Sequence, residues 1–482
     1  MAFEIIMPKL GVDMQEGEII EWKKQEGDVV NEGDILLEIM SDKTNMELEA
    51  EDSGVLLKIT RQAGETVPVT EVIGYIGAEG EVVADNSTSA PAAEATAQLE
   101  AAGLEVPKAP SQPSPATAEK AALADNEYDI VVVGGGPAGY YAAIRGAQLG
   151  GKVAIVEKSE FGGTCLNKGC IPTKTYLKNA EILDGLKIAA GRGINLASTN
   201  YTIDMDKTVD FKNSVVKTLT GGVQGLLKAN KVTIFNGLGQ VNPDKTVTIG
   251  SETIKGRNII LATGSKVSRI DIPGIDSQLV MTSDDILDLR ELPKSLAVMG
   301  GGVVGIELGL VYASYGVDVT VVEMADRIIP AMDKEVSLEL QKILSKKGMK
   351  IMTSVGVSEI VEGNNQLTLK LNNGEEIVAE RALLSIGRVP QLNGLENLNL
   401  ELDRGRIKVN EYQETSIPGI YAPGDVNGTK MLAHAAYRMG EVAAENAMHG
   451  NVRKAHLDYT PAAVYTHPEV ADRKSTRLNS SH

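Results

Sequence analysis

The feature that most constrains the fold is a pattern that occurs twice, at residues 128–157 and again at residues 295–323. Each copy has an apolar run, three consecutive glycines, a second run of helical character and an apolar run that ends in a glutamate. Strands of this kind are typically buried in a parallel sheet, and a glycine-rich turn that opens a helix binds a dinucleotide pyrophosphate. One copy alone also fits a structural turn in another α/β fold. Two copies predict two nucleotide sites.

Both copies place the same residue types at the same positions. Glu157 and Glu323 end the second apolar run, where a carboxylate can accept hydrogen bonds from ribose hydroxyls. Glu323 favours the free 2′-hydroxyl of NAD and would repel the 2′-phosphate of NADP, although Arg327 nearby leaves NADP open. The glycines that let the backbone approach a pyrophosphate are Gly134, Gly136 and Gly139 in the first copy and Gly300, Gly302 and Gly305 in the second.

The chain has two cysteines, Cys165 and Cys170, which are therefore each other's only possible partners within one chain. On a regular helix a separation of five residues gives about 7.5 Å of axial rise, so a disulfide between them needs an irregular turn, which Gly169 can supply. A bond that closes so small a loop gains little stability and is better suited to opening and closing. The alternative is two reduced cytosolic cysteines that are close by chance.

Length and charge limit the function classes. A chain of 482 residues is long enough for about three domains, and its 50 glycines fit α/β domains with glycine-rich turns. The net charge of −18 argues against nucleic acid or an anionic membrane as a partner. The sequence has no apolar run near about 18 residues and no basic start before an apolar run, so we expect no membrane span, no signal peptide and a cytoplasmic location.

Residues 1–79 alternate short strand-like runs with Gly-Asp and Glu-Gly turns, and predict a small all-β unit. Residues 17–30 are echoed by residues 54–67, so we expect a pseudo-symmetric sandwich. Lys43 lies between two strand-like runs at the expected tip of a hairpin. Residues 80–126 are rich in Ala, Pro, Ser, Thr and Glu, which predicts a flexible, proline-stiffened linker.

The segment from Gly162 to Lys174 resembles the redox-active disulfide motif of the pyridine nucleotide disulfide oxidoreductases. This resemblance implies that the first nucleotide is FAD and the second is NAD. It also implies that a substrate thiolate attacks Cys165, and that Cys170 is left as the thiolate that faces the flavin. Lys174 and Glu307 match the two positions that form an ion pair beside the flavin N5 in this family.

Three further regions are similar to the same family. Residues 259–265 and 383–388, with Gly264 and Gly387, resemble the strand–turn segments that close the two nucleotide domains. Residues 419–426 resemble the second FAD motif, whose Asp425 would bond the ribityl chain. Ala433 and His434 would begin a helix beside the isoalloxazine ring. Taken alone, Asp425 or Lys174 also fits an ordinary turn or surface residue.

Residues 1–79 resemble a lipoyl domain, in which Lys43 carries lipoate in amide linkage. Related biotinyl domains have Met on both sides of the lysine, whereas Asp42 and Thr44 stand here. The alternative for Lys43 is a solvated surface lysine. The lipoyl arm and Glu323 together resemble the dihydrolipoyl dehydrogenases of the family, the E3 components that oxidise protein-bound dihydrolipoamide with NAD+. The resemblance implies lipoyl-bearing E2 or H-type proteins of a multienzyme complex as partners, and a homodimer when full length; the alternatives are another FAD disulfide reductase or a lipoyl carrier only.

The expected fold is therefore multidomain: a small all-β sandwich, a linker, two Rossmann-like α/β domains and the start of an α+β interface domain. Residues 459–471 resemble the opening strand of that interface domain, and residues 472–482 match nothing in the family. None of the five histidines stands in the family's catalytic context, so the resemblance implies that this chain is truncated and turns over poorly. No metal site is expected. The expected divisions are 1–79 (lipoyl-like), 80–126 (linker), 127–270 and 396–457 (FAD), 271–395 (NAD), 458–471 (interface) and 472–482 (non-native tail).

Overall fold

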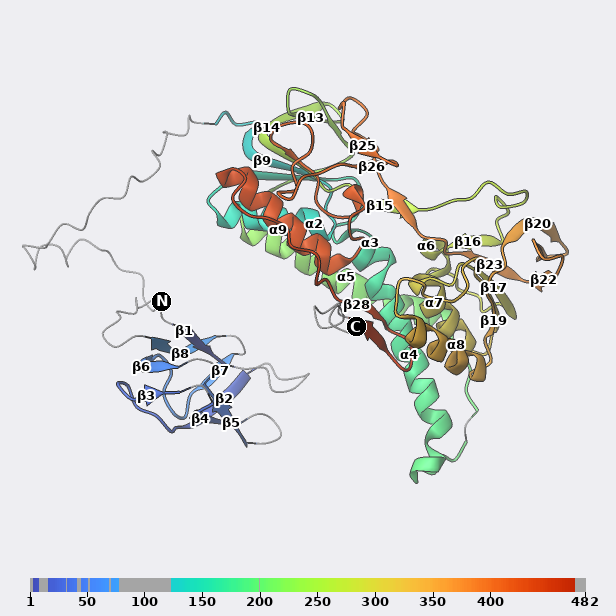
Figure 1. Cartoon of the computed structure of the whole chain (residues 1–482), viewed down its shortest axis with the longest axis horizontal. Helices are drawn as coiled ribbons and strands as arrows, with labels where there is room; N and C mark the ends of the chain where they lie inside the picture. The colour runs from blue at the N-terminus through green and yellow to red at the C-terminus, as the bar shows by residue number, and fades with distance from the viewer. Residues whose placement is uncertain are drawn as a thin grey trace, which may run out of the picture. The chain divides into compact units, whose positions relative to one another are not determined.

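The computed structural model describes residues 3–7, 16–31, 33–40, 45–50, 53–68, 71–77, 123–198 and 200–472. The chain divides into two compact units, Met1–Ala118 and Glu119–His482, each with a core of its own (Figure 1). Most of the expected linker, up to residue 122, and residues 473–482 lie outside the described residues.

The N-terminal unit is built from two four-stranded sheets, ordered β1-β8-β6-β3 and β5-β4-β2-β7. Their inward side chains, among them Ile19, Leu37 and Leu56, are fully buried. This burial is what period-two alternation of apolar residues predicts for two sheets packed face to face. The strands are β1 Phe3–Ile6, β2 Glu16–Trp22, β3 Val29–Val30, β4 Ile35–Met40, β5 Asn45–Glu49, β6 Gly54–Ile59, β7 Thr66–Pro68 and β8 Val72–Gly77.

The internal repeat has a clear place in this sandwich. The first repeat supplies β2 and β3, and the second supplies β6 and β7. Each repeat contributes one strand to each sheet. The first strand of one repeat shares a sheet with the second strand of the other, so β2 and β7 lie in one sheet and β6 and β3 lie in the other. β4 and β5 form the expected hairpin, with Met40 opposite Asn45 as its last described pair. Lys43, predicted between them, lies outside the described residues.

The first large sheet of the second unit has seven strands, in the order β11-β10-β9-β14-β13-β12 with β27 beside β14. Ile130 and Val132 of β9 pack into the core on one face, and Val131 and Val133 pack into the core on the other. This double burial explains the continuous apolar run read from the sequence. The strands are β9 Glu127–Val133, β10 Val153–Glu157, β11 Thr233–Asn236, β12 Gly239–Val241, β13 Thr246–Ile249, β14 Glu252–Leu261 and β27 Ile420–Tyr421.

The second large sheet has five parallel strands, in the order β16-β23-β17-β18-β19. It repeats the construction of the first, because β17 is central and its side chains alternate between two buried cores. A short antiparallel pair, β15 with β24, joins the segments that follow β14 and β23. The strands are β15 Ser265–Val267, β16 Val280–Thr282, β17 Ser295–Met299, β18 Asp318–Val322, β19 Lys350–Met352, β23 Arg381–Leu384 and β24 Arg388–Pro390.

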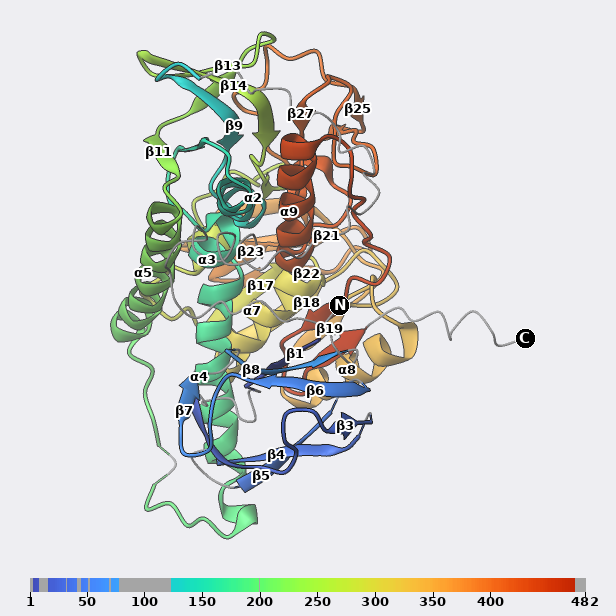
Figure 2. The same ribbon diagram turned by 90° about the vertical axis from the view of Figure 1, so that its left-hand side faces the viewer.

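The helices cover these sheets (Figures 1 and 2). α2 and α9 lie side by side over the seven-stranded sheet, and a Cβ on Gly440 of α9 would meet the backbone of Ala138 of α2. α7 packs along β17 and β18 in the same way. The helices are α2 Pro137–Gln148, α3 Gly163–Lys168, α4 Cys170–Ile188, α5 Met205–Ala229, α6 Ser283–Ile286, α7 Val303–Ser314, α8 Lys334–Lys346 and α9 Ala433–His449, with short turns η1 Ala190–Arg192 and η2 Asp425–Asn427. α2 begins directly after the glycine-rich turn, where Pro137 suits the first helical position.

Two smaller sheets complete the unit, β20 Val357–Gly363, β21 Gln366–Leu371 and β22 Glu376–Ala379, and β25 Leu402–Asp403 with β26 Arg406–Ile407. The C-terminal segment differs from the single strand expected for 459–471. β28 Ala462–Val464 turns back and pairs with β29 Val470–Asp472 as an antiparallel hairpin. Asp472, expected in the tail, is part of this hairpin. In the part of the chain that the structure describes, no helix is long and apolar enough to cross a membrane.

Candidate active site

The two cysteines lie on either side of a break between two helices. Cys165 is inside α3, Cys170 is the first residue of α4, and Gly169 separates the helices with φ −143° and ψ −109°. A Cβ on Gly169 would meet the carbonyl oxygen of Thr164 at 2.9 Å, so a larger residue would disturb the break. The irregular turn predicted from the spacing is therefore present, and both cysteines are thiols.

The two thiols differ in acidity because of their neighbours. A hydrogen bond from the Cys165 thiol lowers the pKa of Cys170 to about 7, burial opposes the change, and the charge of Lys174 assists it. The pKa of Cys165 is raised by its hydrogen bond to Cys170 and by burial. Cys170 is thus the sulfur that carries negative charge near neutral pH.

A buried carboxylate lies beside the cysteines. Glu307 on α7 is 3% exposed, and its Oε2 is 2.8 Å from Lys174 Nζ on α4. Its other oxygen, Oε1, accepts a hydrogen bond from the backbone N–H of Tyr465 (2.8 Å), directly after β28. Lys174 Nζ also lies 4.4 Å from the centre of the Tyr465 ring. The ion pair read from the sequence is present, and Tyr465 completes it.

Glycines shape both loops that follow the central strands. Gly134 and Gly300 have φ of +112° and +107°, a conformation that glycine adopts without strain. Gly139 and Gly305 lie so close to the preceding loop that a Cβ would meet the carbonyl oxygens of Gly134 and Gly300, at 1.8 and 2.2 Å. By contrast, the space beside Gly302 holds no described atom within 4 Å of a Cβ position.

The helices that follow these loops begin without a side-chain cap. α2 and α7 have no side-chain cap among the described residues, and neither do α3, α4 and α9. α5, α6 and α8 are capped by Asp204, Thr282 and Asp333. Uncapped N–H groups with the positive end of the helix dipole attract anions. The uncapped N-termini of α2 and α7 lie at the carboxyl ends of parallel strands, so the glycine loop before each helix fits a dinucleotide pyrophosphate.

The two glutamates at the ends of β10 and β18 are held alike. Glu157 Oε2 accepts from the Gly135 N–H at 2.6 Å, and Glu323 Oε2 accepts from the Gly301 N–H at 2.6 Å. The other oxygen of Glu323 accepts from the Ala325 N–H at 2.7 Å. Each carboxylate is thus oriented by its own glycine loop and keeps lone pairs for ribose hydroxyls.

A polar network joins the predicted FAD segments to the cysteine loop. Asp425 Oδ2 accepts from the Ser265 hydroxyl at 2.6 Å, and the Ser265 hydroxyl accepts from Arg388 Nε at 2.8 Å. A further guanidinium nitrogen of Arg388 lies 3.3 Å from the Thr164 hydroxyl, next to Cys165. Gly264 and Gly387, just before Ser265 and Arg388, have φ of +73° and +111°.

Other predicted residues have more ordinary surroundings. Ala433 is the first residue of α9, and the exposed His434 donates from Nε2 to the Pro461 carbonyl oxygen at 2.7 Å. The described residues contain no group of three or more His, Cys, Asp or Glu that could hold a metal ion.

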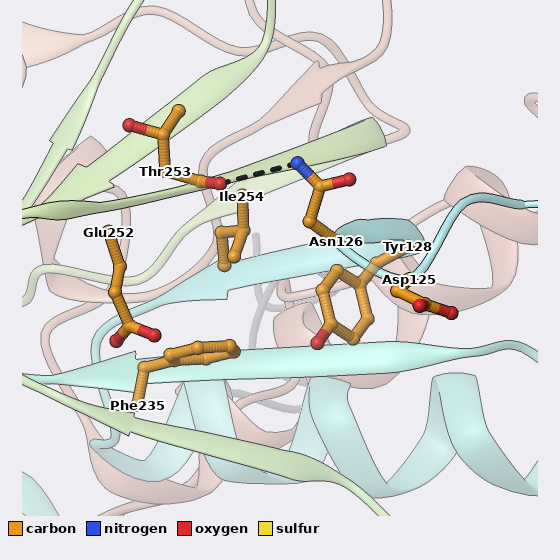
Figure 3. A pocket seen from close by; sticks show the side chains of 7 residues that line it. All are labelled: Asp125, Asn126, Tyr128, Phe235, Glu252, Thr253 and Ile254. Carbon is orange, nitrogen blue, oxygen red and sulfur yellow. Dashed lines mark hydrogen bonds between the residues drawn. The ribbon is translucent and has the colours of Figure 1, made fainter.

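A surface pocket of about 330 Å³ is lined by Tyr128, Phe235 and Ile254 among others (Figure 3). It lies where β9 and β14 begin, and there the Asn126 side chain donates to the Thr253 carbonyl oxygen at 3.5 Å. Ligands of open α/β sheets bind at the opposite, carboxyl ends of the strands. We therefore do not assign this pocket to the active site.

Sequence reasoning did not single out Tyr465, Ser265 or Arg388 as site residues. Arg388 is the last residue of a segment that resembles the family, but the sequence does not show that it contacts Ser265 and Thr164. Tyr465 is 158 residues from Glu307 along the chain. No local pattern could have joined them.

Two family models match the chain. The one described as pyridine nucleotide-disulphide oxidoreductase matches residues 128–440, and the one described as biotin-requiring enzyme matches residues 3–76.

The dihydrolipoyl dehydrogenase of Acholeplasma laidlawii is 42% identical over 327 residues, which cover 67% of this chain and 96% of that protein. The mitochondrial dihydrolipoyl dehydrogenase of Homo sapiens is 40% identical over 363 residues, 71% of this chain and 70% of that protein. Among solved structures, the Cu(II) complex of the HOCl-induced flavoprotein disulfide reductase RclA from Escherichia coli is similar, with a TM-score of 0.64, 26% identity and coverage of 73% of this chain and 79% of that chain.

Proposed function

This chain belongs to the pyridine nucleotide-disulphide oxidoreductase family, and on that premise we propose that it is a dihydrolipoyl dehydrogenase with its own lipoyl domain. It oxidises protein-bound dihydrolipoamide to lipoamide with NAD+, as the E3 component of a 2-oxo acid dehydrogenase or similar complex. The observation that carries the proposal is the pair Cys165 and Cys170 across a helix break, with the ion pair of Lys174 and Glu307 beside it.

The difference in acidity of the two cysteines supports a direction for the thiol chemistry. In the disulfide form a substrate thiolate attacks Sγ of Cys165, the bond between the sulfurs breaks, and Cys170 leaves as the thiolate. Cys170 is the better leaving group because its pKa is the lower of the two. The second substrate thiolate then attacks the mixed disulfide, which closes the lipoamide ring and releases Cys165. Bound FAD supplies the two-electron transfer from the dithiol to NAD+, which yields NADH.

The two glycine loops support the placement of the cofactors. We assign residues 127–270 and 396–457 to a Rossmann-like FAD domain and residues 271–395 to a Rossmann-like NAD domain. Residues 458–472, which include the hairpin of β28 and β29, are assigned to a homodimer interface. The uncapped N-termini of α2 and α7 would each hold a pyrophosphate, and Asp425 with the network behind it would hold the ribityl chain.

The surroundings of Glu323 support NAD over NADP. Arg327, the residue that left NADP open, has one guanidinium nitrogen 2.9 Å from Asp326 Oδ1 and another 3.0 Å from the Pro330 carbonyl oxygen. Two of its three guanidinium nitrogens are therefore engaged within its own loop, whereas its buried Nε has no partner among the described residues. Glu323 keeps its negative charge towards a bound nucleotide and would repel a 2′-phosphate.

The test is a comparison of thiol donors with the purified flavin-loaded chain and NAD+. NADH formed with dihydrolipoamide, however slowly, but not with glutathione supports the proposal, and Cys170→Ser should abolish it. Equal or faster turnover with glutathione would make the protein a different disulfide reductase. A chain that takes up lipoate but binds no flavin would be a lipoyl carrier only.

A further inference from the structure

The C-terminal hairpin touches the ion pair that stands beside the cysteines. Val464, the last residue of β28, is fully buried in the same core as Tyr176 of α4 and Ile306 of α7. This anchor places the next residue, Tyr465, against α4 and α7 at the point where Lys174 and Glu307 meet. The hairpin, α4 and α7 therefore meet at one charged contact.

Tyr465 makes two different contacts there. Its backbone N–H donates to Glu307 Oε1, so both oxygens of that buried carboxylate have a donor. Its ring lies under the Lys174 ammonium at 4.4 Å, within the range of a cation–π contact. The two contacts act on the two members of the pair, one through the backbone and one through the side chain.

We propose that Tyr465 is a positioning residue that holds Lys174 towards Cys170 and so stabilises the Cys170 thiolate. Lys174 is one helical turn after Cys170 on α4, and its side chain is 32% exposed, so without the ring it can turn towards solvent. Glu307 fixes Lys174 by charge, and the ring adds a second, neutral contact. Tyr465 itself neither donates a proton to the sulfurs nor exchanges electrons with them.

The groups that face Cys170 come from several elements. Cys165 of α3 donates a hydrogen bond to it, Lys174 of α4 lowers its pKa, and Glu307 of α7 raises it. Burial raises the pKa of Tyr437 of α9, and the nearby charges of the two cysteines add to that rise. The ring of Tyr465 acts on Cys170 only through the position of Lys174.

The experiment measures the pH dependence of alkylation at Cys170 in the full chain after dithiothreitol reduction, followed by mass spectrometry of the peptide. Replacement of Tyr465 by Leu or by Met removes the ring but keeps the backbone N–H. An exposed cation–π contact changes an equilibrium constant by about threefold. In the Leu and Met variants, the pH at which Cys170 is alkylated at half its maximal rate (the midpoint) should therefore rise by about half a unit. Tyr465→Phe, which keeps the ring, should leave the midpoint unchanged.

Two controls separate positioning from a general loss of structure. Tyr459→Leu removes an exposed ring from the same segment, away from the pair, and should leave the midpoint unchanged. In a Lys174→Met background, loss of the Tyr465 ring should cause no further shift, because the charge it positions is gone. Thermal unfolding identifies any variant that does not fold, and the Leu and Met variants serve as alternatives to each other.

An unchanged midpoint in a folded Tyr465→Leu or Tyr465→Met chain would overturn the inference, as would an equal shift in Tyr459→Leu or a further shift in the Lys174→Met background. The inference rests on the proposed function only in taking Cys170 as the thiolate of the redox pair. Alkylation needs neither dihydrolipoamide nor NAD+, so failure here leaves the proposed reaction standing. Failure of that reaction likewise leaves the alkylation result intact.

Discussion

Replacement by Ala should have different effects at the two glycines of the N-terminal end of α7: at Gly305 it should lower stability, and at Gly302 it should weaken nucleotide binding. A Cβ on Gly305 would meet the Gly300 carbonyl oxygen at 2.2 Å and the Ser385 hydroxyl at 2.5 Å, so the helix must move off its loop. Forced overpacking costs about 1–3 kcal/mol, and the better helix propensity of Ala returns at most about 1 kcal/mol. We therefore expect Gly305→Ala to lower the free energy of unfolding by about 2 kcal/mol.

Gly302→Ala should leave the fold intact and impair nucleotide binding. Its backbone, with φ −71° and ψ 179°, is open to any residue, and a Cβ would point into space without a described atom within 4 Å. If that space receives the pyrophosphate of NAD, the added methyl is expected to cost about 1–3 kcal/mol of binding free energy, roughly 5- to 150-fold in Kd.

The two variants are compared by thermal unfolding and by titration with NADH, with bound flavin as the internal control. Gly302→Ala should unfold like the parent chain, retain its flavin and bind NADH weakly. The reasoning is refuted if Gly302→Ala binds NADH with unchanged affinity, or if Gly305→Ala unfolds at the parent temperature.

Three further predictions concern other parts of the molecule. The ratio of kcat/KM for NAD+ over NADP+ should fall when Glu323 is replaced by Gln, because the charge that repels the 2′-phosphate is lost; an unchanged ratio would exclude that role. Protein made with lipoic acid should exceed its sequence mass by one lipoyl group, and Lys43→Arg should remove the increment; an unmodified parent chain would exclude lipoylation at this residue. Burial raises the pKa of Glu445, but hydrogen bonds from Arg453 and Arg145 outweigh it and leave that pKa below 4.5. This carboxylate therefore stabilises the fold above that pH and loses its contribution as the pH falls through the lowered pKa. Glu445→Gln should make the free energy of unfolding fall less steeply with pH in the acid range. An unchanged dependence on pH in that range would contradict this.

Much of the architecture was accessible from sequence because it depends on local pattern. The continuous apolar runs of β9 and β17 predict strands buried on both faces, and each glycine loop that follows predicts a turn into a helix. The repeat in residues 17–30 and 54–67 predicted two similar halves, which appear as strands exchanged between two sheets. These signals span a few residues at a time, so they need no knowledge of the rest of the fold.

Only the tertiary structure decided which distant groups meet at the cysteines. The break at Gly169 was predicted from spacing, but the lowered pKa of Cys170 depends on the hydrogen bond from Cys165 and on the charge of Lys174, which together outweigh burial. The docking of Tyr465 on Glu307 depends on Val464 entering a core shared by α4 and α7. Contacts between residues so far apart in the chain are set by the packing of whole elements, for which a single sequence carries no periodic signal. The chain's own order of residues thus determined the strands, the loops and the cysteine pair, whereas packing determined the charges that surround that pair.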